Sequence, residues 1–263
     1  PFIIDNKPGA GTIIAAQAVA SAPADGYTLL FGATNHTMIP ALYQGRVKFD
    51  AVKSFRPLCT VASSPTVLVV APSLPVKTLA DYQAKARAEP GRVTAGTAGV
   101  GSSGHFATEM FARAQGLQLN HVPYKGAAPV VTDLMGGQLD SSFAALGSVL
   151  PQIRSGKLAA LAVASPKRST LLPDVPTFAE LGFKGVETAA LVGLVGPAGL
   201  PADVQATLQK QVAAAIQHPA TRQKMIDFGV EPIGNSSADY SALLKSEVTR
   251  WHKLIKDLKI TLD

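Results

Sequence analysis

Apolar residues along this chain fall into two alternating patterns, short continuous runs and longer segments with helical spacing. The clearest run, residues 66–71 (Thr-Val-Leu-Val-Val-Ala), is typical of a strand buried on both faces, because only its first residue is polar. Turn residues such as Pro72, Pro90 and Gly91 bound these runs and segments. The pattern predicts strands near residues 2–5, 27–31, 60–71, 93–95, 119–122, 141–145 and 159–164, and helices near residues 13–21, 79–88, 102–115, 128–135 and 149–155.

Strands that alternate with helices indicate an α/β fold, with a mainly parallel sheet covered by helices on both faces. The last third of the chain differs, because residues 202–217 and 238–258 are predicted to form long amphipathic helices. Two extended segments rich in Pro and Gly bracket the central block, so we expect two domains joined by a double crossover; one continuous sheet is the alternative. The expected domains are residues 1–72 with 192–263, and residues 73–191.

Composition removes several classes of protein from consideration. Of the 263 residues, 47% are hydrophobic and 16% charged, which excludes a disordered chain. No apolar run approaches the roughly 20 residues of a membrane-spanning helix. The net charge of +6 suits an anionic small ligand, but the basic residues are scattered and do not cluster with aromatic ones, so no nucleic-acid partner is predicted. The single cysteine, Cys59, excludes an intramolecular disulfide and is expected in the core.

A glycine-rich segment between a predicted strand and a predicted helix is the most specific local signal. Gly99, Gly101 and Gly104 match G-x-G-x-x-G, the pattern that brings a helix N-terminus close to the phosphates of a dinucleotide. The following strand ends in His-Val-Pro-Tyr-Lys-Gly at residues 121–126, without the carboxylate that binds the ribose of NAD. A basic residue there fits the NADP variant, so an NADP-dependent reductase stays as the alternative function.

The more general interpretation of this segment is a cradle for a carboxylate or phosphate. Amides at a helix N-terminus and the positive end of the helix dipole attract anions. Ser102 and Ser103 can cap the helix and supply hydroxyl donors. Residues 8–12 repeat the design, and residues 32–37 and 124–129 also follow predicted strands. Since ligands of open α/β sheets bind at the carboxyl ends of the strands, we expect these loops to form the site.

Catalytic and metal-binding patterns are absent from the sequence. It contains neither the G-x-S-x-G motif of hydrolases nor the G-x-x-x-x-G-K-[ST] motif of nucleotide-binding loops. The five histidines have no spacing typical of a metal site. A chain with anion-binding groups but no convincing nucleophile, base or metal site is predicted to be a binding protein and not an enzyme.

Taken together, the motifs resemble those of the solute receptors of tripartite tricarboxylate transporters, the Bug or TctC type, over essentially the whole chain. The segments that carry the resemblance are residues 6–11 (Asn-Lys-Pro-Gly-Ala-Gly), 25–29 (Asp-Gly-Tyr-Thr-Leu), 96–105, 121–126, 133–138 (Asp-Leu-Met-Gly-Gly-Gln), 156–158 (Gly-Lys-Leu), 172–177 (Leu-Pro-Asp-Val-Pro-Thr), 180–182 (Glu-Leu-Gly) and 196–201 (Gly-Pro-Ala-Gly-Leu-Pro).

The resemblance implies a periplasmic, monomeric, two-domain binding protein of the type II or Venus-flytrap fold, with a double crossover and no cofactor. It also implies that a small organic carboxylate, or a related small solute, is captured in the interdomain cleft and delivered to membrane permease subunits. The residues that the resemblance places in the cleft are Thr34, Asn35, His36, Thr97, Ala98, Gly99, Gly101, Ser102, Ser103, His105, Tyr124, Lys125, Gly126, Ala144 and Ala145.

Two departures from the family pattern affect these expectations. Family members have a strand, a Gly-rich loop and a helix before the segment that opens this sequence, so we expect this sequence to lack an N-terminal part. The second crossover commonly carries a tryptophan, whereas residues 188–192 here are Thr-Ala-Ala-Leu-Val. The ligand class therefore stays open among dicarboxylates, tricarboxylates, amino acids, aromatic acids and amides. A sensing module attached to a signalling partner is a further alternative.

Overall fold

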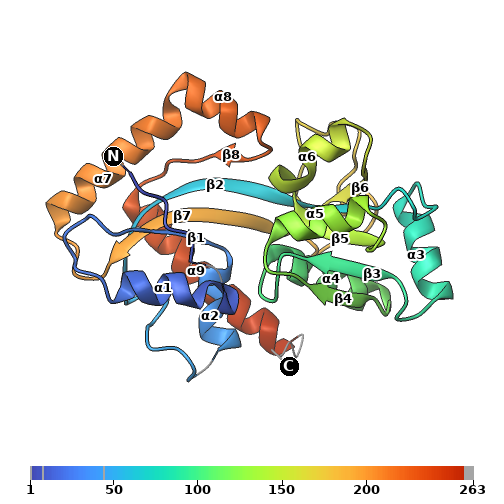
Figure 1. Cartoon of the computed structure of the whole chain (residues 1–263), viewed down its shortest axis with the longest axis horizontal. Helices are drawn as coiled ribbons and strands as arrows, with labels where there is room; N and C mark the ends of the chain where they lie inside the picture. The colour runs from blue at the N-terminus through green and yellow to red at the C-terminus, as the bar shows by residue number, and fades with distance from the viewer. Residues whose placement is uncertain (1, 8, 44, 258–263) are drawn as a thin grey trace. The chain divides into compact units, whose positions relative to one another are not determined.

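The computed structural model describes residues 2–7, 9–43 and 45–257. Its contacts divide the chain into two compact units. Unit 1 comprises Pro1–Ser63, Leu191–Lys224 and Glu231–Asp263, and unit 2 comprises Ser64–Ala190 and Met225–Val230. The chain passes from one unit to the other within strands β2 (Phe55–Val70) and β7 (Ala189–Pro197), and again at both ends of Met225–Val230 (Figure 1). The domain boundaries expected from the sequence, residues 1–72 with 192–263 and residues 73–191, stay a prediction.

Unit 2 is built on a sheet with the strand order β2-β5-β3-β4. β3 (Thr94–Thr97) pairs in parallel with both β4 (Asn120–Pro123) and β5 (Ser141–Ala145). The C-terminal part of β2 is antiparallel to β5 and to β6 (Ala159–Val163). The predicted parallel arrangement is thus found where helices connect successive strands. No single helix connects β2 to β5 or to β6. A helical crossover, which would make the two strands parallel, is therefore absent from these pairs.

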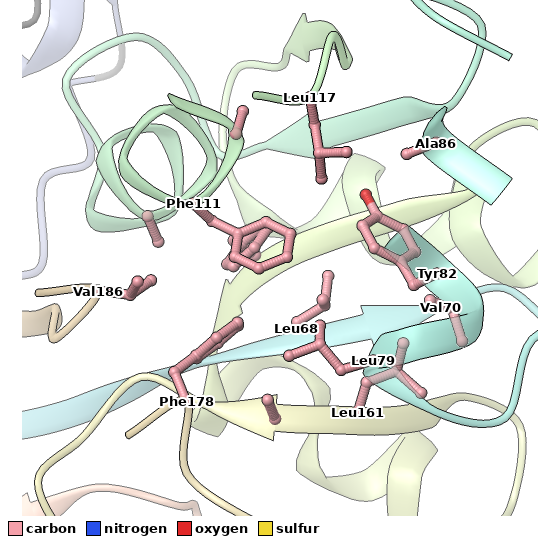
Figure 2. Packing of buried hydrophobic residues seen from close by; sticks show 14 of the residues in the cluster. Leu68, Val70, Leu79, Tyr82, Ala86, Phe111, Leu117, Leu161, Phe178 and Val186 are labelled. Atoms are coloured by element: carbon pink, nitrogen blue, oxygen red, sulfur yellow. The ribbon is translucent and has the colours of Figure 1, made fainter. Parts of the chain in front are cut away.

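Both faces of this sheet are covered, which explains the continuous apolar run in β2. Leu68 and Val70 point to the face covered by α3 (Leu79–Ala88) and α4 (Ser103–Gln115), where they belong to a cluster with Tyr82 and Phe111 (Figure 2). The alternate residues of β2 point to the opposite face, which is covered by α5 (Ala127–Met135) and α6 (Leu146–Arg154). Because side chains alternate along a strand, a run buried on both faces has to be apolar throughout.

Unit 1 combines N-terminal and C-terminal elements around its own core. β1 (Leu30–Ala33) is antiparallel to β7, and β8 (Glu231–Pro232) is antiparallel to β2, so the mainly parallel pattern predicted for each domain is not found in these pairs. Leu30, Phe55 and Leu244 belong to the core, and Cys59 is fully buried, as predicted. The remaining elements are η1 (Ala10–Thr12), α1 (Ile13–Ala20), α2 (Asn35–Leu42), α7 (Ala202–Gln217), α8 (Pro219–Asp227) and α9 (Ser237–Asp257).

Three predictions of local structure were wrong, and each has a physical reason. Residues 2–5 form no strand and their apolar side chains are exposed, because no other described strand supplies hydrogen bonds to them. Helix α2 was missed because Pro40 lies inside it, and β2 begins earlier than predicted because Pro57 interrupts the strand signal. Pro8, in the predicted loop of residues 8–12, and Leu258, at the end of the predicted last helix, lie outside the described residues.

Candidate functional site

The loops that follow β3 and β4 in unit 2 are joined by backbone hydrogen bonds. Thr97 and Pro123 are paired residues at the ends of the two parallel strands. Beyond them, the Tyr124 amide donates to the Thr97 carbonyl at 2.9 Å and the Gly126 amide donates to the Ala98 carbonyl at 3.2 Å. The structure therefore brings the two loops together at the carboxyl edge of the sheet, as the sequence predicted.

The glycines of the first loop are explained by backbone geometry. Gly99 and Gly101 have φ values of 127° and 79°, which residues other than glycine rarely adopt. A Cβ atom on Gly99 would lie 3.0 Å from the carbonyl oxygen of Tyr124. A Cβ atom on Gly104 would overlap the carbonyl oxygen of Phe143, so this glycine allows α4 to pack closely on β5. The G-x-G-x-x-G pattern thus has a structural explanation that needs no nucleotide.

The N-terminus of α4 offers donors that have no partner among the described residues. Ser102 is the N-cap, and its Oγ accepts a hydrogen bond from the His105 amide at 3.2 Å. The amides of Ser103 and Gly104 lie in the first turn, where a helix supplies no carbonyl partner. Ser103 is only 6% exposed, and its hydroxyl makes no hydrogen bond to any residue that the structure describes. A hydroxyl donor, two amides and the positive end of the helix dipole suit a carboxylate oxygen.

Two histidines lie behind this loop with their rings stacked. The ring centroids of His105 and His121 are 4.4 Å apart, with 18° between the planes. His105 Nδ1 accepts a hydrogen bond from the Gly101 amide at 3.3 Å, and His121 Nε2 is hydrogen-bonded to Thr97 Oγ1 at 2.7 Å. Burial, with a smaller effect of His121, lowers the pKa of His105 to about 3. Burial also lowers the pKa of His121, against the opposing effect of Glu109, so both rings are neutral near pH 7.

The second loop presents one hydroxyl and one charge. Tyr124 donates its phenolic hydrogen to Asp133 Oδ2 at 2.5 Å. This bond, with smaller contributions from burial and from the Asp133 charge, raises the pKa of Tyr124 to about 12. Lys125 is exposed and forms no ion pair with another described residue. The Lys125 ammonium group is therefore free to attract an anion, whereas the Tyr124 hydroxyl offers mainly its oxygen.

Ala144 and Ala145 end β5 at the same edge of the sheet, because β5 is parallel to β3. Both are half-buried, and the Ala145 carbonyl accepts a hydrogen bond from Ser148 Oγ at 2.7 Å. These two residues have apolar side chains, so they can contribute only shape and backbone groups.

Residues 34–36, in unit 1, are not the loop that the sequence predicted. Thr34 is the N-cap position of α2, and its Oγ1 accepts a hydrogen bond from the Leu191 amide at 2.7 Å. His36 is 3% exposed, and its Nε2 donates to the Ala51 carbonyl at 2.7 Å. Burial lowers the pKa of His36, against the opposing effect of that bond. Asn35 alone of the three is half-exposed without a hydrogen bond to another described residue.

Other candidates for chemistry are few. Among the described residues, no group of three or more His, Cys, Asp or Glu side chains could hold a metal ion.

The sequence analysis did not predict the hydrogen bonds of His121 and of Asp133. Thr97 and His121 are 24 positions apart, so only the register of two strands brings them together. In the part of the chain that the structure describes, no helix combines the length and apolar content needed to cross a bilayer.

Known proteins resemble this chain over nearly its whole length. Residues 1–260 match the family model described as tripartite tricarboxylate transporter family receptor, TctC. Protein BugT of Bordetella pertussis is 31% identical over 258 residues, which are 98% of this chain and 79% of BugT. The structure of R. palustris Rpa4515 with adipate has a TM-score of 0.94 and 35% identity, over 99% of this chain and 87% of that one.

The structure of periplasmic binding protein BugD has a TM-score of 0.92 and 31% identity, over 98% of this chain and 87% of that one. Sequence motifs, fold and relatives therefore agree on one family, and the resemblance inferred from the motifs is confirmed. This chain belongs to the TctC family of tripartite tricarboxylate transporter receptors and has the α/β fold of its periplasmic binding proteins.

Proposed function

We propose that this receptor captures a small organic carboxylate at the loops of unit 2 and delivers it to the membrane permease of a tripartite tricarboxylate transporter. The observation that carries the proposal is the hydroxyl of Ser103, a largely buried residue at the N-terminus of α4, because this hydroxyl has no hydrogen-bond partner among the described residues. Rpa4515 with adipate, a structure 35% identical to this chain, supports a dicarboxylate. We also propose that the protein acts in the periplasm and that it binds its ligand without catalysing a reaction.

The ligand would meet donors from both unit 2 loops. One carboxylate oxygen accepts from Ser103 and from the first-turn amides of α4, and Lys125 on the neighbouring loop balances the charge. Hydrogen bonds to a charged group contribute about 1.5–3 kcal/mol each. We also propose that the remaining members of the predicted site, including those of unit 1, contribute to binding, with His105 acting through the loop and not by contact with the ligand. The interdomain cleft and the monomeric state are part of the same proposal.

A thermal unfolding screen of the full-length protein tests the proposal. The panel contains adipate, malate, citrate, aspartate, benzoate and NADPH, each at a large excess. A ligand at about 100 times its Kd stabilises by about 2.7 kcal/mol, which raises the Tm by several degrees. We expect a shift with at least one carboxylate and none with NADPH. A shift with NADPH alone would overturn the proposal in favour of the reductase.

A pair of serine variants then locates the site. We expect Ser103→Ala to weaken binding of the stabilising carboxylate by about tenfold or more, as calorimetry measures it. The control is Ser246→Ala, on α9 of unit 1, where the hydroxyl donates to the Leu243 carbonyl at 2.9 Å. Equal affinities for the two variants would show that the carboxylate binds elsewhere.

A further inference from the structure

We infer that His105 and His121 are positioning residues, which hold the glycine loop before α4 in the conformation that presents the helix N-terminus to a ligand. The inference rests on the proposed function and assigns the two histidines to the support of the site instead of to contact with the carboxylate. It is carried by the hydrogen bonds and the ring contact described above, which link the loop to the end of β3.

The loop needs such support because glycine makes it flexible. Gly99 and Gly101 both have positive φ, and ordering glycine costs more backbone entropy than ordering any other residue. The Gly101 amide would otherwise point to no partner within the loop's own backbone. Its hydrogen bond to His105 Nδ1, at 3.3 Å, fixes the middle of the loop to the first turn of α4.

The direction of this bond determines the state of the ring. An amide N–H can only donate, so Nδ1 of His105 must be unprotonated and the ring hydrogen must lie on Nε2. Protonation of Nδ1 would place two donors face to face. Burial of His105, which is 5% exposed, keeps the ring in the neutral form that the loop requires.

The second ring keeps the first from turning. His121 stacks on His105 and is itself fixed by its bond to Thr97 Oγ1, at 2.7 Å. Thr97 is fully buried at the end of β3. A chain of contacts therefore runs from the rigid strand through both rings to Gly101. Two apolar side chains could fill the same space, but they could not bind the amide or the hydroxyl.

The first test is made on the unmodified protein and needs no ligand. The ¹⁵N chemical shifts of an imidazole ring distinguish a protonated nitrogen from an unprotonated one. We expect the His105 ring to be neutral at pH 7, with the hydrogen on Nε2, and the Gly101 amide to be protected from hydrogen exchange. A protonated Nδ1, or an unprotected Gly101 amide, would overturn the inference.

Paired variants separate positioning from packing. His105→Leu keeps bulk but removes the acceptor, whereas His105→Asn places an amide oxygen near the position of Nδ1. We expect His105→Leu to lower Gly101 protection and adipate affinity about tenfold, and His105→Asn to restore part of both. The control is His252→Asn, at an exposed position of α9. Equal protection of Gly101 in the Leu and Asn variants would contradict the inference.

The ring stack is tested with two variants of His121. His121→Phe keeps an aromatic ring against His105 but loses the bond to Thr97, and His121→Gln keeps a polar group for Thr97 but loses the stack. We expect each to lower Gly101 protection less than His105→Leu does. Unchanged protection in both would remove His121 from the inference. Failure of adipate and other carboxylates to bind would refute the proposed function alone, because the exchange measurements do not depend on a ligand.

Discussion

Gly104, in the first turn of α4, lies with its Cα against the carbonyl oxygen of Phe143 on β5. No side chain fits between them, and this contact sets how close the N-terminus of α4 comes to the edge of the sheet. The donors of the proposed carboxylate site therefore depend on a glycine that contributes no side chain.

Gly104→Ala should destabilise the protein, because the added methyl group would overlap backbone that cannot move away cheaply. We expect a loss of about 1–3 kcal/mol in the free energy of unfolding, measured by urea denaturation. Gly136→Ala is the matched control. Gly136 has a φ of −81°, and its Cβ would lie 3.4 Å from the nearest atom, the Thr132 carbonyl oxygen. Similar losses for the two variants would contradict the proposed close packing.

His36 makes unit 1 sensitive to acid. Burial lowers its pKa in the folded state, so the unfolded chain binds more protons once the pH falls below about 6.5. Stability is then lost as the pH decreases, by up to about 1.4 kcal/mol per pH unit for each such group. His105 and His121, whose pKa values are also lowered by burial, act in the same direction.

His36→Gln should reduce this dependence, because glutamine can still donate to the Ala51 carbonyl but does not titrate. The measurement is urea unfolding at pH 7.5 and pH 5, with His252→Gln at an exposed position as the control. We expect a smaller difference between the two pH values for His36→Gln than for the control. Identical differences would mean that the buried His36 ring is not required to be neutral.

Tyr124 should ionise late because its hydroxyl donates to Asp133. In Asp133→Asn the negative acceptor is lost, and we expect the pKa of Tyr124 to fall from about 12 toward the ordinary value of about 10. The measurement is the ultraviolet absorbance of ionised tyrosine between roughly pH 10 and 11. Subtracting the same titration of a matched Tyr124→Phe variant, made with and without Asp133→Asn, leaves the contribution of Tyr124. A titration that Asp133→Asn leaves unchanged would show that the bond does not form in solution.

The fold was predictable from sequence where burial leaves a regular pattern. The apolar run at residues 66–71 gave the right strand, because the sheet is covered on both faces there. The run at residues 2–5 gave a wrong one, since a strand depends on a partner that local sequence does not reveal. Helix α2 was hidden by Pro40, whose effect on a helix depends on how its neighbours replace the lost hydrogen bond.

The candidate site was predictable as a set of loops but not as a set of interactions. The rule that ligands bind at the carboxyl ends of strands placed the loops after β3 and β4 at one edge, and backbone bonds join them there. The stacking of His105 on His121 and the bond from Tyr124 to Asp133 depend on register and on side-chain rotamers. Neither leaves a signal in one sequence.

The most direct test of the proposed function is a titration of the ¹⁵N-labelled receptor with the carboxylate that stabilises it most, followed through its backbone amide resonances. We expect the amides of Ser103 and Gly104 to show the largest shifts, both to saturate at one Kd, and this Kd to rise about tenfold or more in Ser103→Ala. Saturable binding with the largest shifts outside the N-terminus of α4, and the same Kd in Ser103→Ala, would contradict it.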